Sequence, residues 1–95
     1  MIKHVVMWKM KENSEEITKE FLDGLKGLVG KVEGLVDIET GSNPVIASDY
    51  DAILISTFTS LDALQAYNIH PEHQELAKLC KTVAVQRSAF DYYFE

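Results

Sequence analysis

Cysteine is almost absent from this sequence: Cys80 is the one thiol among 95 residues. A single cysteine excludes an internal disulfide and any zinc site built from several thiolates. It lies in an apolar stretch with helical spacing, so we expect a buried, unreactive thiol. Because small secreted domains usually depend on disulfides, one unpaired cysteine favours a reducing, cytoplasmic location.

Basic residues and long apolar runs are also scarce. Nine Lys and Arg stand against fifteen Asp and Glu, which gives a formal net charge of −6. This charge repels phosphate backbones, so no nucleic acid is expected as a partner. The opening segment MIKHVVMWKMK carries lysines along its length, which is typical neither of a signal peptide nor of a membrane span. No membrane partner is therefore expected.

Apolar residues are present in generous supply, 46% of the chain, and their spacing indicates one domain over residues 1–95. Alternation at every second position is typical of strands. We predict strands over 2–11, 35–40, 50–58 and 84–95. On the first strand the even positions share one face and the odd positions share the other.

Helical spacing of apolar residues lies between the first two strands and between the last two. A capping box of Asn13 and Glu16 is expected to begin the first helix, which should end at residues 30–32. A second capping box, Thr59 with Asp62, is expected to begin the next helix, and Pro71 to begin a further segment. The resulting β-α-β-β-α-β order predicts an α+β, ferredoxin-like antiparallel sheet with the helices on one face.

One face of such a sheet has no cover within the monomer. The side chains expected there are too apolar to be left in water; they are Val5, Met7, Ile53 and Ile55. A second copy of the chain that supplies an equivalent sheet is the simplest cover, so a homodimer about a two-fold axis is predicted.

The stretch AYNIHPEHQE contains the side chains best suited to catalysis or metal binding, namely Tyr67, His70 and His73. If Pro71 is the first helical residue, His70 is the N-cap and His73 is the third position. The positive end of the helix dipole should lower the pKa of His73, which leaves a neutral imidazole able to accept a proton. Its helical spacing to Cys80 places His73 on the face toward the sheet.

Two plainer interpretations of this stretch remain open. The imidazole of His73 and the hydroxyl of Tyr67 are also typical of polar groups that complete a small core, and His70 of a cap bonded to backbone amides. A zinc pair of His70 and His73, completed by Glu72 and Glu75, is disfavoured because a cap residue and a third-position residue need not point the same way.

The sequence resembles the dimeric α+β-barrel proteins of the stress-responsive A/B-barrel (Dabb) domain family. The resemblance covers essentially the whole chain and rests on MIKHVVMWKMK, YDAILISTF, LQAYNIHPEHQE and AFDYYFE. It implies a ferredoxin-like monomer whose sheet joins that of a second copy to form a barrel.

The family includes plant polyketide cyclases of the olivetolic acid cyclase type, which close a ring by aldol condensation without a cofactor. By resemblance, their catalytic histidine and tyrosine correspond to His73 and Tyr67, and a pocket histidine corresponds to His4. Another pocket histidine falls at Ala52, which is a departure from the pattern. Some members hold a structural magnesium ion through main-chain carbonyls, which correspond here to Val29, Val32 and Leu35.

If the chain is a cyclase, the residues imply a pocket for a small apolar molecule rich in carbonyl groups. His73 would act as the base and Tyr67 as the hydrogen-bond donor to the developing enolate. The expected walls of this pocket are Trp8, Phe21, Leu25, Leu54 and Phe58, with His70 nearby. The alternatives are a non-catalytic stress-protective or ligand-binding dimer and a cofactor-free monooxygenase-like enzyme.

Overall fold

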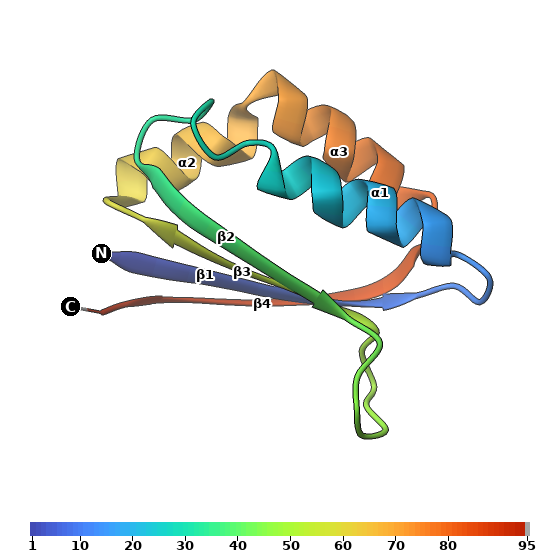
Figure 1. The fold of residues 1–95 in the computed structure, drawn as a ribbon. Coiled ribbons are helices and arrows are strands. Elements are labelled where there is room, and N and C mark those ends of the chain that lie inside the picture. The colour runs from blue at the N-terminus through green and yellow to red at the C-terminus, as the bar shows by residue number, and fades with distance from the viewer. Residues whose placement is uncertain (95) are drawn as a thin grey trace.

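The computed structural model describes residues 1–94 and arranges them as three helices over one four-stranded antiparallel sheet (Figure 1). Along the chain the elements are β1 (Ile2–Met10), α1 (Glu15–Lys26), β2 (Leu35–Ser42), β3 (Ala52–Phe58), α2 (Leu61–Ile69), α3 (Pro71–Lys81) and β4 (Ala84–Tyr93). The sheet order β2-β3-β1-β4 makes the first and last strands neighbours. The predicted fold class is confirmed, and the second helical region consists of two helices. The strand predicted over 84–95 ends with Glu95, which lies outside the described residues.

The alternation predicted for β1 decides which face of the sheet is covered. Its even-numbered side chains, from Ile2 to Met10, are between 1% and 8% exposed, whereas Val5 and Met7 on the other face are half-buried. In β3, Leu54 and Phe58 face the helices in the same way and are fully buried. Each large apolar side chain buried in this layer stabilises the fold by roughly 1.5–3 kcal/mol.

Helix α1 packs on this layer through buried Phe21, Leu22 and Leu25. Its predicted capping box is wrong: the N-cap is Ser14, which makes no side-chain cap bond. Asn13 instead adopts a left-handed conformation, with φ of 60°, which asparagine tolerates better than most residues. It therefore turns the chain before the helix and cannot cap it.

The first helix is also shorter than predicted, because it ends at Lys26. Beyond it, the amide of Leu28 donates to the carbonyl of Leu25 and that of Val29 to Lys26, at 3.1 and 3.3 Å. These are bonds across three residues, so the chain continues in tighter turns. Gly30, with φ of 91°, completes the change of direction.

The second predicted capping box is displaced by one residue. Ser60 caps α2, and its Oγ accepts the amide of Ala63 at 3.1 Å. The amide of Thr59 donates to the carbonyl of Gly34 at 2.9 Å, so Thr59 still belongs to the pairing between strands. Among the described residues, no helix has the length and apolar character needed to cross a membrane.

Helices α2 and α3 are separated because His70 precedes Pro71. A residue before proline avoids the helical conformation, and His70 is extended, with φ of −60° and ψ of 132°. Its Nδ1 then accepts the amide of Glu72 at 3.2 Å, and Pro71 is the first residue of α3. The predicted cap and helix start are both confirmed.

The face of the sheet opposite the helices is bare and apolar. Val5, Met7, Ile53 and Ile55 lie there half-buried, as predicted, because they occupy the positions alternate to the buried ones. Phe90 of β4 pairs with Val5 across the strands and is 69% exposed. Figure 1 shows all helices on the other side of the sheet.

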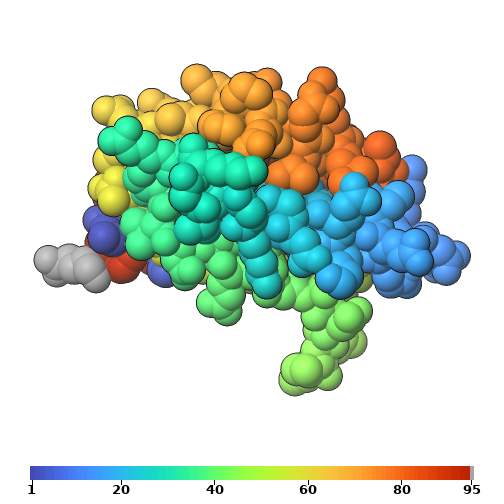
Figure 2. Space-filling model, turned by 45° about the horizontal axis from the view of Figure 1, so that its top comes forward, coloured from blue at the N-terminus to red at the C-terminus, as the bar shows by residue number. Residues whose placement is uncertain are grey.

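A protruding arm, residues 43–50, joins β2 to β3. It extends from the bare side of the sheet in Figure 1, and Figure 2 shows it standing clear of the body. Val45 is fully exposed and Ile46 is 78% exposed. At the base of the arm, the Tyr50 hydroxyl and Ser88 Oγ are 2.8 Å apart, which fastens the arm to β4.

Candidate active site

A pocket of about 340 Å³ lies between the helices and the covered face of the sheet. It brings together most of the predicted site residues. The predicted residues that line it are His4, Trp8, Phe21, Leu25, Leu54, Tyr67 and His73. They come from strands β1 and β3 and from all three helices, so the pocket exists only in the folded chain.

Phe58 and His70 do not line this pocket, contrary to their predicted ligand contact. Phe58 is fully buried behind Tyr67, with 5.1 Å between the ring centroids. His70 occupies the junction of α2 and α3, where its Nδ1 caps a helix. Both residues support the site from outside.

Tyr67 and His73 are in direct contact at the wall of the pocket. Their ring centroids are 4.3 Å apart, and the rings are tilted by 48°. The ring of His4 lies 6.1 Å from that of Tyr67, at a steep angle of 69°. Tyr67 therefore stands between the two imidazoles that line the pocket.

The hydroxyl of Tyr67 is buried and has no hydrogen-bond partner among residues 1–94. Burial raises the pKa of Tyr67, against the smaller opposing effect of Arg87, so the phenol keeps its proton at neutral pH. A buried polar group without a partner is rare, because its desolvation is not compensated. The hydroxyl is thus a buried donor whose hydrogen bond is unused within the described residues.

His73 is held in one tautomer by its own helix junction. Its Nδ1 lies 3.3 Å from the carbonyl oxygen of Asn68. A carbonyl only accepts hydrogen bonds, so Nδ1 carries the proton and Nε2 keeps a free lone pair. This is the form of imidazole that a general base requires.

The pKa of His73 is lowered, in the predicted direction. The main cause is burial, and the positive charges of His4, Arg87 and His70 lower it further, whereas the bond to Asn68 raises it. The sequence pattern attributed the shift to the helix dipole. Burial dominates because the ring is packed against Tyr67 in the pocket wall.

This lowered pKa predicts an acid-sensitive stability. An unfolded histidine titrates at about 6.5, so below that pH the unfolded chain binds more protons than the folded one. The contribution of His73 is fully present above about pH 6.5 and decreases as the pH falls toward its folded pKa. We expect His73→Gln to lose less stability than the wild type between about pH 7 and pH 5, measured by urea unfolding; parallel curves would contradict the shift.

His4 is oriented by Asp91, a residue of the last strand that the sequence pattern did not assign to the site. Its Nδ1 lies 2.5 Å from Oδ1 of Asp91, which pairs with it across strands β1 and β4. Because an ionised carboxylate only accepts, Nδ1 of His4 carries the proton. The available signal was the antiparallel pairing of the first and last strands, which sets Asp91 opposite His4.

Cys80 also borders the pocket, and it is 6% exposed. Burial raises the pKa of its thiol to about 11. Because the thiolate is the reactive form, this cysteine is inert at neutral pH. The predicted buried thiol is confirmed.

The residues predicted to hold magnesium lie in the turns between α1 and β2. The carbonyl of Val32 already accepts the amide of Leu35 at 3.2 Å. Magnesium is usually held by one or two carboxylates, and the described residues contain no cluster of three His, Cys, Asp or Glu side chains. The carbonyls of Val29, Val32 and Leu35 are therefore a poor set for this ion, and no chemistry is assigned to it.

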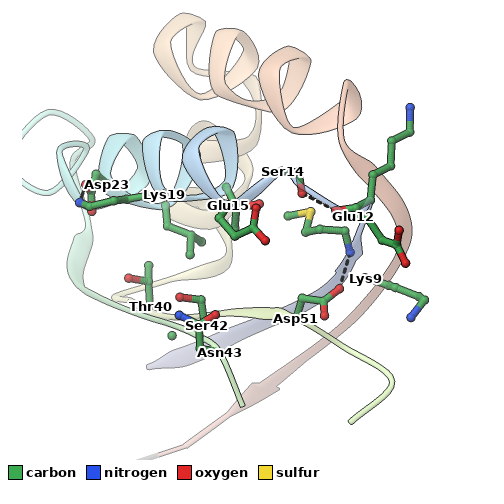
Figure 3. Close-up of a pocket in the computed structure, with 15 residues that line it drawn as sticks. Lys9, Glu12, Ser14, Glu15, Lys19, Asp23, Thr40, Ser42, Asn43 and Asp51 are labelled. Atoms are coloured by element: carbon green, nitrogen blue, oxygen red, sulfur yellow. Dashed lines mark hydrogen bonds and ion pairs between the residues drawn. The ribbon is translucent and has the colours of Figure 1, made fainter. Parts of the chain in front are cut away.

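A larger hollow, of about 680 Å³, lies between α1 and the ends of β1 and β2 (Figure 3). Three of its charged groups already have partners: Lys19 Nζ lies 2.6 Å from Asp23 Oδ2, and Asp51 Oδ2 accepts the amide of Met10 at 2.7 Å. The hydrogen bond from Lys19 holds the pKa of Asp23 below its usual value. No histidine lines this hollow, so it lacks the general base that the smaller pocket contains.

Comparison with known proteins identifies the family. The pattern of the stress responsive A/B barrel domain matches residues 2–94. The chain belongs to this family. The resemblance noted in the sequence is therefore confirmed.

Two curated proteins and one solved structure are similar to this chain over most or all of its length. The chain is 27% identical over 101 residues to the stress-response A/B barrel domain-containing protein DABB1 of Arabidopsis thaliana, covering 100% of this chain and 48% of that protein. It is 27% identical over 95 residues to olivetolic acid cyclase of Cannabis sativa, covering 96% and 94%. A dimeric, ferredoxin-like protein of unknown function from Bacteroides fragilis is 28% identical, with a TM-score of 0.81 over 98% of this chain and 95% of that one. The chain thus spans about half of the first relative and nearly all of the other two.

Proposed function

We propose that this Dabb chain is a single-domain, homodimeric enzyme that needs no cofactor and removes a proton from a carbon beside a carbonyl group. The reaction class is that of a cyclase or lyase acting on a small, carbonyl-rich apolar molecule. The observation that carries the proposal is the buried Tyr67 hydroxyl, which has no partner within residues 1–94 and belongs to a ring packed against that of His73. The identity to olivetolic acid cyclase supports the same class.

The first chemical step follows from the two side chains. Nε2 of His73 accepts the proton, and the electrons of the broken C–H bond form an enolate. The hydroxyl of Tyr67 donates a hydrogen bond to the enolate oxygen, where negative charge develops. The lowered pKa of His73 keeps the base unprotonated near neutral pH, and a positioned base of this kind contributes roughly 10²–10⁴-fold in rate.

His4 is proposed as the second imidazole of the site. Asp91 binds Nδ1 of His4 and so fixes the orientation of the ring. Its ring packs edge-on against both Tyr67 and Phe58. His4 therefore helps to position Tyr67 at the wall of the pocket.

The homodimer is proposed to form through the bare face of the sheet. Val5, Ile55 and Phe90 form one cross-strand row on this face, and Met7 with Ile53 forms the next. An apolar face of this kind needs a cover, and the B. fragilis relative is dimeric. The pocket lies on the opposite side of the sheet, so dimer formation leaves it open.

A non-catalytic ligand-binding dimer is the second candidate, and one observation favours it. Ala52 stands where the cyclase pattern has a pocket histidine. In this structure Ala52 pairs with Trp8 but does not line the 340 Å³ pocket. A binding protein would keep the pocket without the full set of cyclase side chains.

Deuterium exchange tests the proposed chemistry without knowledge of the natural substrate. We would follow by ¹H NMR the loss of the α-proton signals of 2-octanone and ethyl 3-oxooctanoate in D₂O. The wild type is expected to accelerate exchange, and His73→Ala to return the rate to that of buffer. Lys78→Gln is the matched control, because Lys78 is an exposed residue of the same helix, paired with Glu75. Equal rates for wild type and His73→Ala would contradict the proposal, and bound probe without exchange would favour the second candidate.

A further inference from the structure

The 340 Å³ pocket has basic side chains at one end. Lys81 at the end of α3 and Arg87 in β4 both line it, together with Gln86. Within the described chain, no carboxylate belongs to the same lining. The chain has fifteen acidic and nine basic residues. A pocket lined by two basic side chains and by no carboxylate is therefore unexpected from the composition.

Neither cation has an ion-pair partner within residues 1–94. The ion pairs of the structure involve other basic groups, namely His4, Lys19, Lys31 and Lys78. The position of Lys81 has an ordinary explanation, since a positive charge suits the last turn of a helix. A helix dipole does not explain the position of Arg87, because Arg87 lies within strand β4.

The register of the sheet places Arg87 on the same side of the sheet as Tyr67 and His73. It pairs with Trp8 across β1 and β4, and directly paired residues project to the same face. Trp8 faces the helices and is 5% exposed, so Arg87 lies on the helix side also. Burial is the main reason why the pKa of His73 is low, and the charge of Arg87 lowers it further.

Apart from its imidazoles, Tyr67 and the polar end, the pocket is lined by apolar and aromatic side chains. Trp8 and Phe21 meet edge to face, with 5.1 Å between ring centroids, and Leu25 and Leu54 complete the floor. A pocket of this size, with an apolar floor and few polar groups, is typical of a site for a small molecule. A pocket with cations at one end and an apolar floor is suited to an amphiphile, a molecule with a charged head group and an apolar body.

We propose that this pocket binds a small amphiphilic anion, with its apolar body on Trp8 and Phe21 and its carboxylate or phosphate head group held by Arg87 and Lys81. The guanidinium fork of arginine suits two-point binding of either head group. This inference rests on the proposed function and names the class of its substrate: a carbonyl-rich apolar chain that ends in a negative charge.

Trp8 supplies the measurement, because it is the only tryptophan of the chain and lines the pocket. We would titrate its fluorescence with octanoate, octyl phosphate and octan-1-ol, which share one apolar tail. We expect at least one of the two anions to bind roughly tenfold more tightly than the alcohol, as a hydrogen-bonded charge pair requires. The anion that binds more tightly identifies the preferred head group.

Substitution of Arg87 tests whether this side chain causes the preference for anions over the alcohol. Arg87→Gln is expected to remove most of the advantage of the anions over the alcohol, because only Lys81 then holds the head group, and to leave the affinity for the alcohol unchanged. Arg87→Lys should keep part of the preference, because it keeps the charge but loses the fork. Lys78→Gln, which removes an exposed charge already paired with Glu75, should change none of the affinities.

The outcomes separate this inference from the proposed function. Equal binding of the anions and the alcohol, or an anion preference that Arg87→Gln leaves undiminished, would overturn the inference while leaving the exchange reaction of His73 intact. An anion preference lost in Arg87→Gln, in a protein that exchanges no α-protons, would support the inference and refute the proposed chemistry. If none of the probes changes the emission of Trp8, the inference is refuted.

Discussion

Tyr67→Phe is expected to make the protein more stable and less active at the same time. The wild-type hydroxyl is buried and has no hydrogen-bond partner within residues 1–94. Phenylalanine keeps the ring, and so keeps its packing against Phe58 and His73. Removal of an uncompensated buried polar group should raise the free energy of unfolding by about 1–3 kcal/mol.

The same substitution removes the donor proposed for the enolate oxygen. Loss of one such donor lowers rates by roughly 10²–10³-fold in other enzymes, so α-proton exchange should fall by a similar factor. Urea unfolding and the exchange assay on one preparation give both quantities. Opposite changes in stability and rate are typical of a group retained for function rather than for folding.

Tyr50→Phe is the matched control for this experiment. Its hydroxyl lies 2.8 Å from Ser88 Oγ, on the bare side of the sheet. Loss of that bond should lower stability by about 0.5–1.5 kcal/mol and leave exchange unchanged. If Tyr67→Phe also lowers stability, its hydroxyl has a partner in the folded protein, and the central observation is refuted. An unchanged exchange rate would remove Tyr67 from the mechanism.

Ile55→Asp is expected to dissociate the dimer. Ile55 pairs with Val5, which pairs in turn with Phe90, so the side chain belongs to the apolar row on the bare face. A carboxylate there must lose its hydration when the faces meet, and an unpaired buried charge is strongly unfavourable. We expect the dissociation constant of the dimer to rise at least about a hundredfold, measured by sedimentation equilibrium.

Leu61→Asp controls for the general effect of a new charge. Leu61 is 47% exposed and is the first residue of α2, in the helix layer on the other side of the sheet. An acidic residue also suits the positive end of a helix, so this variant should remain dimeric and folded. A wild type that sediments as a monomer, or an Ile55→Asp variant that stays dimeric, would contradict the proposed interface.

The sequence predicted the parts of the fold that depend on burial. Alternation in β1 separated Val6 and Trp8 from Val5 and Met7, and the structure buries the first pair against the helices. The two capping boxes were misplaced by one residue for a different reason. The sequence pattern of a capping box contains no information on the positive φ of Asn13 or on the hydrogen bond from Thr59 to Gly34. Both depend on how the chain turns in three dimensions.

The candidate site was predictable where its residues lie close in sequence. Tyr67 and His73 are near neighbours across a helix junction, and helical spacing set His73 toward the sheet. Asp91 and Arg87 were missed because they reach the pocket region through the register of β4 against β1. Phe58 was assigned to the pocket wall by its face alone, and only packing shows that Tyr67 covers it.

The most direct test of the proposed site is a ¹⁵N NMR titration of the ring nitrogens of His73 in the intact protein. The contact with Asn68 and the burial of the ring predict a neutral imidazole at neutral pH, with the proton on Nδ1 and none on Nε2. They also predict a pKa below about 6.5 and a shift of the Nε2 resonance when ethyl 3-oxooctanoate is added. A ring that titrates at or above about 6.5, with a resonance that the probe leaves unchanged, would contradict His73 as the base.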